Sequence, residues 1–360
     1  MKVVVTGATG YLGGRLVQGL IHASNEVRAL VRKSSVVDEI PQQVELVYGD
    51  VRDLNSLVSA FAGCDAVIHV GAMVSSWSPT PALYYTINVE GLRNVIQAVQ
   101  QTPSVQKLIY TSSYFAVGPT GDDAVNEEQV HDGKSFTSEY EKSKYLADIV
   151  ARDAAKDGVP IVMLYPGTIY GPGKRTAGNI VSEFVFRCLM SLLRHSSVLG
   201  KTRVLAFEYR APIVERFNGR LPGYLGSGND RNPLCHVDDV AFGHIAALTY
   251  GRVGERYFLC GDAVSFKEVL DVAAEFTKTS RPMFTLPLWL LEIYGRASCF
   301  FAKRFGFIPA VTPEAIAVLR KKWIYSSEKA ERELGYRSRP FAEGLAEVIV
   351  WLKDLKLIKY

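Results

Sequence analysis

Short apolar runs alternate with segments of helical periodicity along the first half of the chain. The runs are KVVVTG, EVRALV, VELVYGD, AVIHVGA, KLIYTSS and PIVMLYPG, and the segments between them carry apolar residues at amphipathic-helix spacing. Continuous apolar strands separated by helices are typical of a parallel sheet that is covered on both faces. The pattern predicts an α/β fold, a doubly wound parallel sheet of the Rossmann type, whose ligand lies beyond the carboxyl ends of the strands.

The alternation stops after about residue 166, where glycine, proline and irregular segments become more frequent. The stretches HVDDVAFGHIAAL and ERYFLCG, within residues 235–262, return to a helix and strand pattern. We therefore predict a first domain over residues 1–166 that is rejoined by 235–262. Residues 167–234 and 263–360 are predicted to form a smaller, mainly C-terminal substrate lobe.

Composition and charge argue against several classes of function. The net charge of +4 over 360 residues, without a dense basic tract, argues against a nucleic-acid partner. Five scattered cysteines lack metal-ligand spacing, so we expect no metal site and a reducing, cytoplasmic location. The opening MKVVVTG leaves no room for a targeting peptide, and four charged residues interrupt FTLPLWLLEIYGRASCFFAKRFGF, so no transmembrane span is expected.

A glycine-rich turn joins the first predicted strand to the first predicted helix. In VVVTGATGYLGGRL, three glycines stand where a tight turn, a close backbone approach and a helix N-terminus suit a pyrophosphate. The alternative is a turn with spare glycines, but the junction at the start of a βαβ series favours a dinucleotide site. The first domain is thus predicted to bind a dinucleotide. The contacts expected from this turn are Gly7, Thr9, Gly10, Tyr11, Leu12 and Gly13.

The end of the second predicted strand normally selects between NAD and NADP. VRALVRKSS carries Arg32 and Lys33 there and no carboxylate, which favours NADP, although both side chains can instead be simply solvated. Asp50, in YGDVRD, is placed to accept a hydrogen bond from the adenine amino group or else to cap the following helix. The other predicted cofactor contacts are Val51, Ala72 and Pro166.

The stretch TSEYEKSKYLAD, residues 137–148, places Tyr140 and Lys144 on one face of a predicted helix. Most such pairs are solvated helix surface, and that alternative stays open for the stretch alone. Beside a dinucleotide site the pair has a chemical use, because a phenol is a poor base unless a nearby cation lowers its pKa. Ser113, directly after the fifth predicted strand, supplies a third group. We predict Ser113, Tyr140 and Lys144 as catalytic residues, and expect the last two also to contact the cofactor.

These motifs resemble the extended, epimerase/dehydratase-like branch of the short-chain dehydrogenase/reductase family. The G-x-x-G-x-x-G spacing and the Ser/Tyr/Lys order are typical of the family, and Asn88 in TINVEGLRNV matches the Asn-Val-x-Gly helix of the branch. CHVDDVAFGH and YSSEKAERELGY resemble two further motifs of the branch; His236 and its paired acids are expected to be structural rather than catalytic. YPGTIYGPG departs from the pattern, since Tyr165 replaces an arginine.

Within the branch, ERFNGRLPGYLGSGNDR is similar to plant dihydroflavonol-reductase-like proteins and farnesol dehydrogenases. This resemblance implies NAD, whereas Arg32 favours NADP, so the predicted cofactor is NAD or NADP. In the resembling proteins GNIV is followed closely by ERFNGRLPGY; here an atypical insertion at about 183–214 intervenes.

The resemblance and the residues together predict oxidation of an apolar alcohol or reduction of its carbonyl, with a prenyl alcohol such as farnesol as the implied substrate. FTLPLWLLEIYG is expected either to roof an apolar pocket or to be an ordinary core helix. The alternatives are a dihydroflavonol-type ketone reductase, a membrane-associated sterol dehydrogenase, a nucleotide-sugar epimerase or dehydratase, and a dinucleotide sensor without turnover. A homodimer is left open as the assembly.

Overall fold

The computed structural model describes residues 1–75, 77–174, 179, 216–217, 223–306, 309 and 311–358. The atypical insertion predicted at about 183–214 lies outside the described residues.

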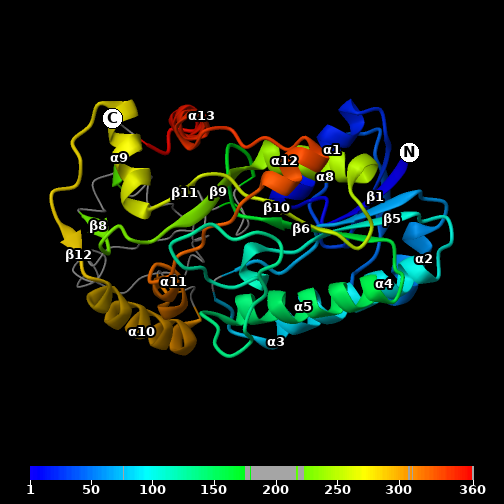
Figure 1. The fold of residues 1–360 in the computed structure, drawn as a ribbon, viewed down its shortest axis with the longest axis horizontal. Helices are drawn as coiled ribbons and strands as arrows, with labels where there is room; N and C mark the ends of the chain where they lie inside the picture. Colours follow the sequence, from blue (N-terminus) through cyan, green and yellow to red (C-terminus); the bar gives the residue numbers. More distant parts are fainter. Residues whose placement is uncertain are drawn as a thin grey trace, which may run out of the picture.

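A seven-stranded parallel sheet forms the centre of the molecule (Figure 1). The chain starts at an inner strand, winds outward to the nearer edge of the sheet, and then returns and winds outward to the other edge. Every apolar run of the sequence forms one strand, and the predicted doubly wound Rossmann fold is confirmed. Across the sheet the strands are β10 (Arg256–Leu259), β6 (Ile161–Pro166), β5 (Lys107–Thr111), β4 (Ala66–His69), β1 (Lys2–Thr6), β2 (Glu26–Val31) and β3 (Glu45–Tyr48).

Helices cover both faces of the sheet, as its apolar strands require. On one side Val4 and Val67 pack in a cluster with α2 (Leu54–Phe61), α4 (Gly91–Gln100) and α5 (Glu139–Lys156). On the other side Val3 and Val5 pack with α1 (Tyr11–His22), α8 (Val237–Tyr250) and α12 (Glu328–Leu334). Neighbouring residues of one strand therefore serve two separate cores.

Residues after 235 return to the central sheet. Strand β10 pairs in parallel with β6, with Tyr257 opposite Leu164. Helix α8 lies against α1, where a Cβ atom on Gly19 would come within 2.6 Å of the Ile245 side chain. The glycine thus allows the two helices to approach closely.

A second group of elements lies beyond the carboxyl ends of the strands (Figure 1). Its strands are short, and they form a three-stranded sheet in the order β11-β9-β7 and a two-stranded sheet of β12 and β8. The division into the two predicted domains remains a prediction. The elements are β7 (Thr168–Tyr170), β8 (Tyr224–Leu225), β9 (Asn232–His236), β11 (Ala263–Val264), α9 (Phe266–Thr277), β12 (Thr285–Leu286), α10 (Leu288–Phe305), α11 (Pro313–Val318) and α13 (Phe341–Asp354).

Candidate active site

One cavity of about 960 Å³ lies at the carboxyl ends of the central strands. Its wall includes Thr6 at the end of β1, Val31 at the end of β2, Thr111 at the end of β5 and Pro166 at the end of β6. This is the ligand position expected for an open, doubly wound sheet. The residues predicted from the sequence that line this cavity are Gly7, Thr9, Gly10, Tyr11, Leu12, Gly13, Arg32, Asp50, Val51, Ala72, Ser113, Tyr140, Lys144 and Pro166. Lys33 is exposed and is absent from the lining.

The glycine turn has a shape that larger residues would disrupt. Gly7 has a φ of +73°, and a Cβ atom there would lie 2.8 Å from the Cα atom of Gly71. A Cβ atom on Gly13 would lie 2.1 Å from the carbonyl oxygen of Gly7. The backbone amides at the start of α1 are thereby left open to the cavity, and such a turn fits the pyrophosphate of a dinucleotide.

Asp50, which was predicted to contact the adenine, is paired with Arg52. Asp50 accepts hydrogen bonds from the Nε, Nη2 and backbone nitrogen of Arg52, at 2.9, 2.7 and 3.0 Å. This bidentate pair lowers the pKa of Asp50. Arg32 and Arg52 both line the cavity. Asp50 does not cap α2, since that position belongs to Asp53, which accepts from Asn55 and Ser56. Arg52 was not predicted from the sequence.

Lys144 is buried in the wall of the cavity, with 3% of its surface exposed. Its ammonium group donates a hydrogen bond of 3.2 Å to the carbonyl oxygen of Thr111 and lies 5.7 Å from the centre of the Tyr110 ring. Burial lowers the pKa of Lys144 to about 8, against the opposing effect of the Asp148 carboxylate. A lysine with this pKa is a cation that loses its proton readily in a mildly alkaline solution.

Tyr140 and Ser113 come from different elements and meet at the same cavity. Tyr140 lies in the first turn of α5, which Ser138 caps by accepting from the backbone nitrogen of Glu141. Its ring packs edge-on against Phe115, with centres 5.7 Å apart. Ser113 precedes the short 3₁₀ turn Tyr114–Ala116, and its hydroxyl oxygen accepts from the backbone nitrogen of Phe115 at 3.3 Å. Because that bond uses only a lone pair, the hydroxyl keeps its own proton for donation.

Asn88 connects the first turn of α5 to the cavity wall. It is buried in a π-helical turn, Tyr85–Glu90, between α3 (Ala82–Tyr84) and α4. Its amide donates to Ser143 Oγ at 3.0 Å and to Met73 O at 3.1 Å, and it accepts from Met73 N at 2.7 Å. Ser143 Oγ in turn donates to the carbonyl oxygen of Tyr140 at 2.8 Å. The motif that contains Asn88 was recognised in the sequence, whereas the hydrogen bonds of Asn88 to Met73 and Ser143 were not predicted.

Two buried histidines are held neutral behind the cavity. His244 Nδ1 lies 2.8 Å from the carbonyl oxygen of Val240, and its Nε2 lies 2.8 Å from Thr111 Oγ1. Since the carbonyl can only accept, Nδ1 carries the proton and Nε2 accepts from Thr111. Burial lowers the pKa of His244 to about 4 and that of His69 to about 3. Neither ring carries a charge at neutral pH.

Tyr165 shows how the departure from the family motif is accommodated. Its hydroxyl donates to Asp148 Oδ1 at 2.5 Å, while Arg152 donates to the other carboxylate oxygen at 2.9 Å. The guanidinium of Arg256 lies 5.9 Å from the centre of the Tyr165 ring. Asp148 therefore has hydrogen-bond partners although position 165 is not an arginine.

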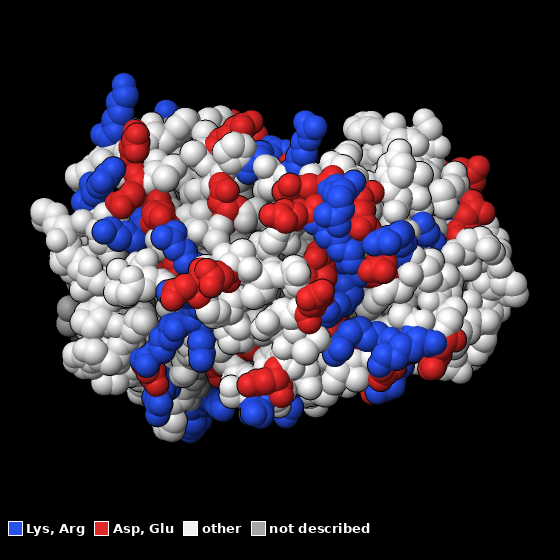
Figure 2. Space-filling view, in the orientation of Figure 1, with Lys and Arg blue, Asp and Glu red and all other residues white. Residues whose placement is uncertain are grey.

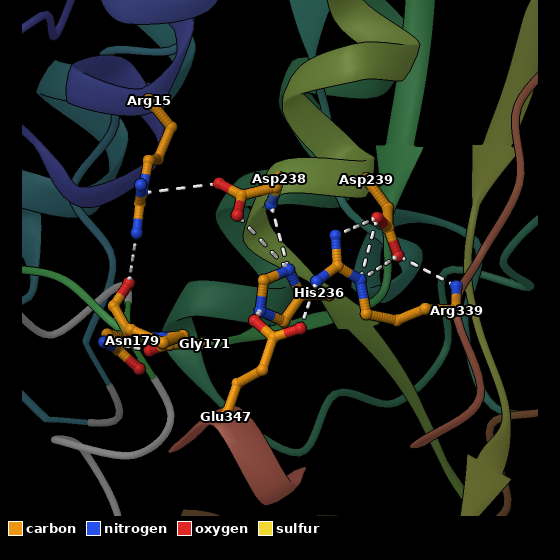
Figure 3. Close-up of polar contacts among 9 residues, drawn as sticks. Arg15, Gly171, Asn179, His236, Asp238, Asp239, Arg339 and Glu347 are labelled. Atoms are coloured by element: carbon orange, nitrogen blue, oxygen red, sulfur yellow. Dashed lines mark hydrogen bonds and ion pairs between the residues drawn. The ribbon is translucent and has the colours of Figure 1, made fainter. Parts of the chain in front are cut away.

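His236 and its neighbours form a polar cluster at the start of α8 (Figure 3). His236 is fully buried, and its Nδ1 accepts from the backbone nitrogen of Asp238 at 3.3 Å. Its Nε2 faces Glu347 Oε2 at 3.5 Å, and Arg339 pairs with Asp239 at 2.7 Å. The contact of His236 with Glu347 links the start of α8 to α13, and neither His236 nor Asp239 lines the cavity; the structural role expected for them remains a prediction.

Much of the remaining lining is apolar. FTLPLWLLEIYG was expected either to roof the pocket or to be an ordinary core helix; it contributes no residue to the lining, because α10 packs behind α11. No helix within the described ranges is long and apolar enough to cross a membrane. No cluster of His, Cys, Asp or Glu in the same residues is arranged to hold a metal ion. The C-terminal lining residues are Phe266, Val269, Glu314, Ala315, Val318, Leu319, Phe341 and Leu345.

Comparisons with known proteins cover nearly the whole chain. Residues 3–260 match the profile of the NAD dependent epimerase/dehydratase family. A Synechocystis protein with the provisional name dihydroflavonol 4-reductase is 29% identical over 364 residues, covering 99% of this chain and 95% of that protein. Sterol demethylase protein B of Methylococcus capsulatus is 27% identical, covering 99% of this chain and all of the relative. The crystal structure of gox2253 has a TM-score of 0.76 at 29% identity and covers 99% of both chains.

Proposed function

Because the chain belongs to the NAD dependent epimerase/dehydratase family, we propose that it interconverts an apolar alcohol and its carbonyl by hydride transfer, with NAD or NADP as cofactor. The expected membership of the extended short-chain dehydrogenase/reductases is confirmed. The observation that carries the proposal is the shared cavity. It brings a tyrosine, a buried lysine and a serine to the glycine turn, beside a largely apolar wall.

The glycine turn and the carboxyl-end cavity fit a dinucleotide, which supplies the hydride acceptor for oxidation and the hydride donor for reduction. The residues of the chain move the proton. In oxidation the Tyr140 phenolate takes the hydroxyl proton of the alcohol, and in reduction the Tyr140 phenol returns a proton to the carbonyl oxygen. The Lys144 ammonium stabilises the phenolate, and the Ser113 hydroxyl donates a hydrogen bond to the substrate oxygen.

The lining favours an apolar substrate over a nucleotide sugar. Aromatic and aliphatic side chains dominate the part of the cavity lining that α9, α11 and α13 contribute. Among the described residues of these three helices, Glu314 is the one charged residue that lines the cavity. A sugar diphosphate needs cations or helix N-termini around its phosphates. Phe115 packs at 5.7 Å against the ring of Tyr140, so the substrate carbon next to the reacting oxygen meets an aromatic surface.

The names of relatives and the sequence motifs favour particular substrates. The names of two relatives refer to a dihydroflavonol and to a sterol, and the sequence motifs resemble farnesol dehydrogenases. A sterol and farnesol are apolar alcohols, whereas a dihydroflavonol is an aromatic ketone that carries several polar hydroxyl groups. We propose a prenyl alcohol such as farnesol first, with steroid and dihydroflavonol substrates as the competing candidates.

Turnover tests the proposal directly. The purified protein is assayed by nicotinamide absorbance against prenyl alcohols, steroid alcohols, dihydroflavonols and nucleotide sugars, each with NAD and with NADP. Turnover of one apolar class with a tyrosine-dependent rate supports the proposal. Turnover of a nucleotide sugar alone, or dinucleotide binding without turnover of any apolar alcohol or carbonyl, refutes it.

A further inference from the structure

Helix α10 exposes an apolar surface that the cavity does not use. Seven of its side chains and the two residues Met283 and Phe284 make up this surface, which we call the α10 face. Met283 is 94% exposed, and Phe300 and Phe305 are each 68% exposed. Exposed aromatic side chains gathered in this way mark an interaction site on a folded protein. The members of the α10 face are Met283, Phe284, Trp289, Leu290, Ile293, Ala297, Phe300, Phe301 and Phe305.

The opposite side of α10 holds it firmly to the protein. Leu291, Gly295 and Ala302 are buried, and a Cβ atom on Gly295 would lie 3.3 Å from the backbone of Pro313 at the start of α11. Aromatic contacts order the exposed side, since the Phe300 and Phe301 rings have centres 5.5 Å apart. The α10 face is therefore the outward side of an anchored helix.

Basic residues border this face, and the guanidinium of Arg304 lies 5.6 Å from the centre of the Phe305 ring within it. Arg296, Lys303 and Arg304 on α10 are exposed, and so are Arg320 and Lys321 after α11. The acidic Glu292 is already paired with Arg296 at 2.8 Å and with Arg320 at 2.6 Å. Figure 2 shows Lys and Arg side chains gathered at the lower left, the end of the molecule where Figure 1 places α10 and α11. The border is net positive.

We propose that the α10 face binds the surface of a lipid bilayer that contains anionic lipids, with α10 lying in the plane of the interface. Aromatic and aliphatic side chains on one side of a helix, bordered by Lys and Arg, have the chemistry of an interfacial helix. The apolar side chains enter the boundary of the acyl chains, and the basic ones contact anionic headgroups. The helix does not cross the bilayer, in keeping with its interruption by charged residues.

Charge decides between this occupant and a second copy of the chain. Two copies that meet through their α10 faces would bring two net positive borders into one contact. Like charges brought together in a partly desolvated contact oppose association. An anionic bilayer instead complements the same charges.

The position of α10 places the α10 face close to the cavity. Leu291 and Ile316 belong to one buried cluster, and Ala315 and Val318 of the same α11 segment line the cavity. One short helix thus separates the bilayer-facing side from the cavity. An apolar substrate dissolved in the bilayer would have a short route to the site; this last step rests on the proposed function, whereas lipid binding does not.

Sedimentation with vesicles tests the proposal without substrate or turnover. The full chain is mixed with vesicles of phosphatidylcholine alone or of phosphatidylcholine with phosphatidylserine, at low and high salt. The test variant is Trp289→Glu with Phe300→Glu. Its matched control is Phe242→Glu with Tyr250→Glu, which alters two comparably exposed aromatic residues of α8, at 52% and 63% exposure. A charge-reversal variant, Lys303→Glu with Lys321→Glu, changes two exposed basic residues and no member of the α10 face.

The intact chain and the α8 control are expected to sediment with phosphatidylserine vesicles, more weakly at high salt. The α10 variant should partition about tenfold or more weakly, because two aromatic side chains no longer enter the interface. The charge-reversal variant should lose the preference for phosphatidylserine. Equal binding by the α10 and α8 variants overturns the proposal, as does an intact chain that ignores vesicles. If the α10 variant merely changes a dimer into a monomer, the face is a contact between copies, and the proposal is also overturned.

Discussion

The ammonium nitrogen of Lys144 lies 3.2 Å from the carbonyl oxygen of Thr111, whose hydroxyl is bonded to the buried ring of His244. This places the positive charge of Lys144 at the carboxyl end of β5, where little water reaches it. The charge that suits proton transfer therefore has a cost in stability. Burial, the cause of the lowered pKa, is the physical link between the two.

The free energy of unfolding should record this cost. The pKa of Lys144 falls from 10.5 to about 8 on folding, so between these values the unfolded chain holds a proton that the folded protein has lost. The contribution of Lys144 to the free energy of unfolding is therefore lowest below about pH 8. It rises with pH, by on the order of 3 kcal/mol in total. Urea unfolding of wild type and Lys144→Met at a series of pH values measures it. The difference in free energy of unfolding between the two proteins should change in favour of the wild type as pH rises. A difference that stays the same at every pH would contradict the lowered pKa of Lys144.

Tyr140→Phe should keep dinucleotide binding and lose turnover. The substitution removes only the oxygen that carries the proton, and general acid–base participation is typically worth ~10² to 10⁴ in rate. Dinucleotide titration followed by cofactor fluorescence, together with kcat for the best substrate, separates the two effects. Tyr145→Phe, a helix turn further on, is the matched control and should retain activity. An unchanged kcat in Tyr140→Phe would remove tyrosine from the mechanism.

The central sheet could be predicted because its strands are apolar on both faces and its helices are long. The short strands β8, β11 and β12 have two residues each, too few for any periodicity, and were not predicted. The sequence also left open which side of FTLPLWLLEIYG is buried. Helical spacing shows which residues share a face, but not which neighbour covers it, so the exposed α10 face emerged only from the structure.

Cofactor choice should depend on Arg32. If its guanidinium contacts a 2′-phosphate, Arg32→Asp will weaken NADP far more than NAD, because a carboxylate repels the phosphate and accepts from the ribose hydroxyl. Arg52→Ala is the informative companion, since Arg52 is already held by Asp50 and should affect the two cofactors similarly. Dissociation constants of both cofactors decide the matter. Equal losses of NAD and NADP in Arg32→Asp would show that Arg32 is only solvated.

The candidate site was predictable where a motif and its neighbours in sequence carry the chemistry. All of the predicted site residues line one cavity, although their roles remain predictions. Partners distant in sequence were missed: Asn88 donates to Ser143, 55 positions away, and Tyr165, which stands where the resembling motif has an arginine, donates to Asp148. The side-chain pairing of Arg52 with Asp50 was also missed, because two adjacent charged residues give no signal of which atoms meet.

Asn88→Ala should slow turnover and lower stability. It leaves the backbone nitrogen and the carbonyl oxygen of Met73 without their Asn88 partner, a loss of about 1–3 kcal/mol for each group left unsatisfied away from water. It also frees the first turn of α5, so kcat should fall more than dinucleotide affinity. Ser143→Ala removes the two bonds of the Ser143 hydroxyl but keeps both bonds between Asn88 and Met73, so it should give a smaller loss in both urea unfolding and kcat. A variant with lower stability and unchanged kcat would make Asn88 purely structural.

Strand β10 reaches the sheet only after the chain has left it at residue 166 and passed through β7, β8, β9 and α8. During synthesis on the ribosome, residues 1–166 emerge while β6, an entirely buried strand in the finished protein, still has an unpaired edge. The helix α8, which covers α1, is also still missing. A nascent chain, or a fragment truncated before residue 256, therefore displays an open apolar edge that favours aggregation and chaperone binding. The segment that contains α8 and β10 must therefore be synthesised before the chain can cover this edge and avoid aggregation and chaperone binding.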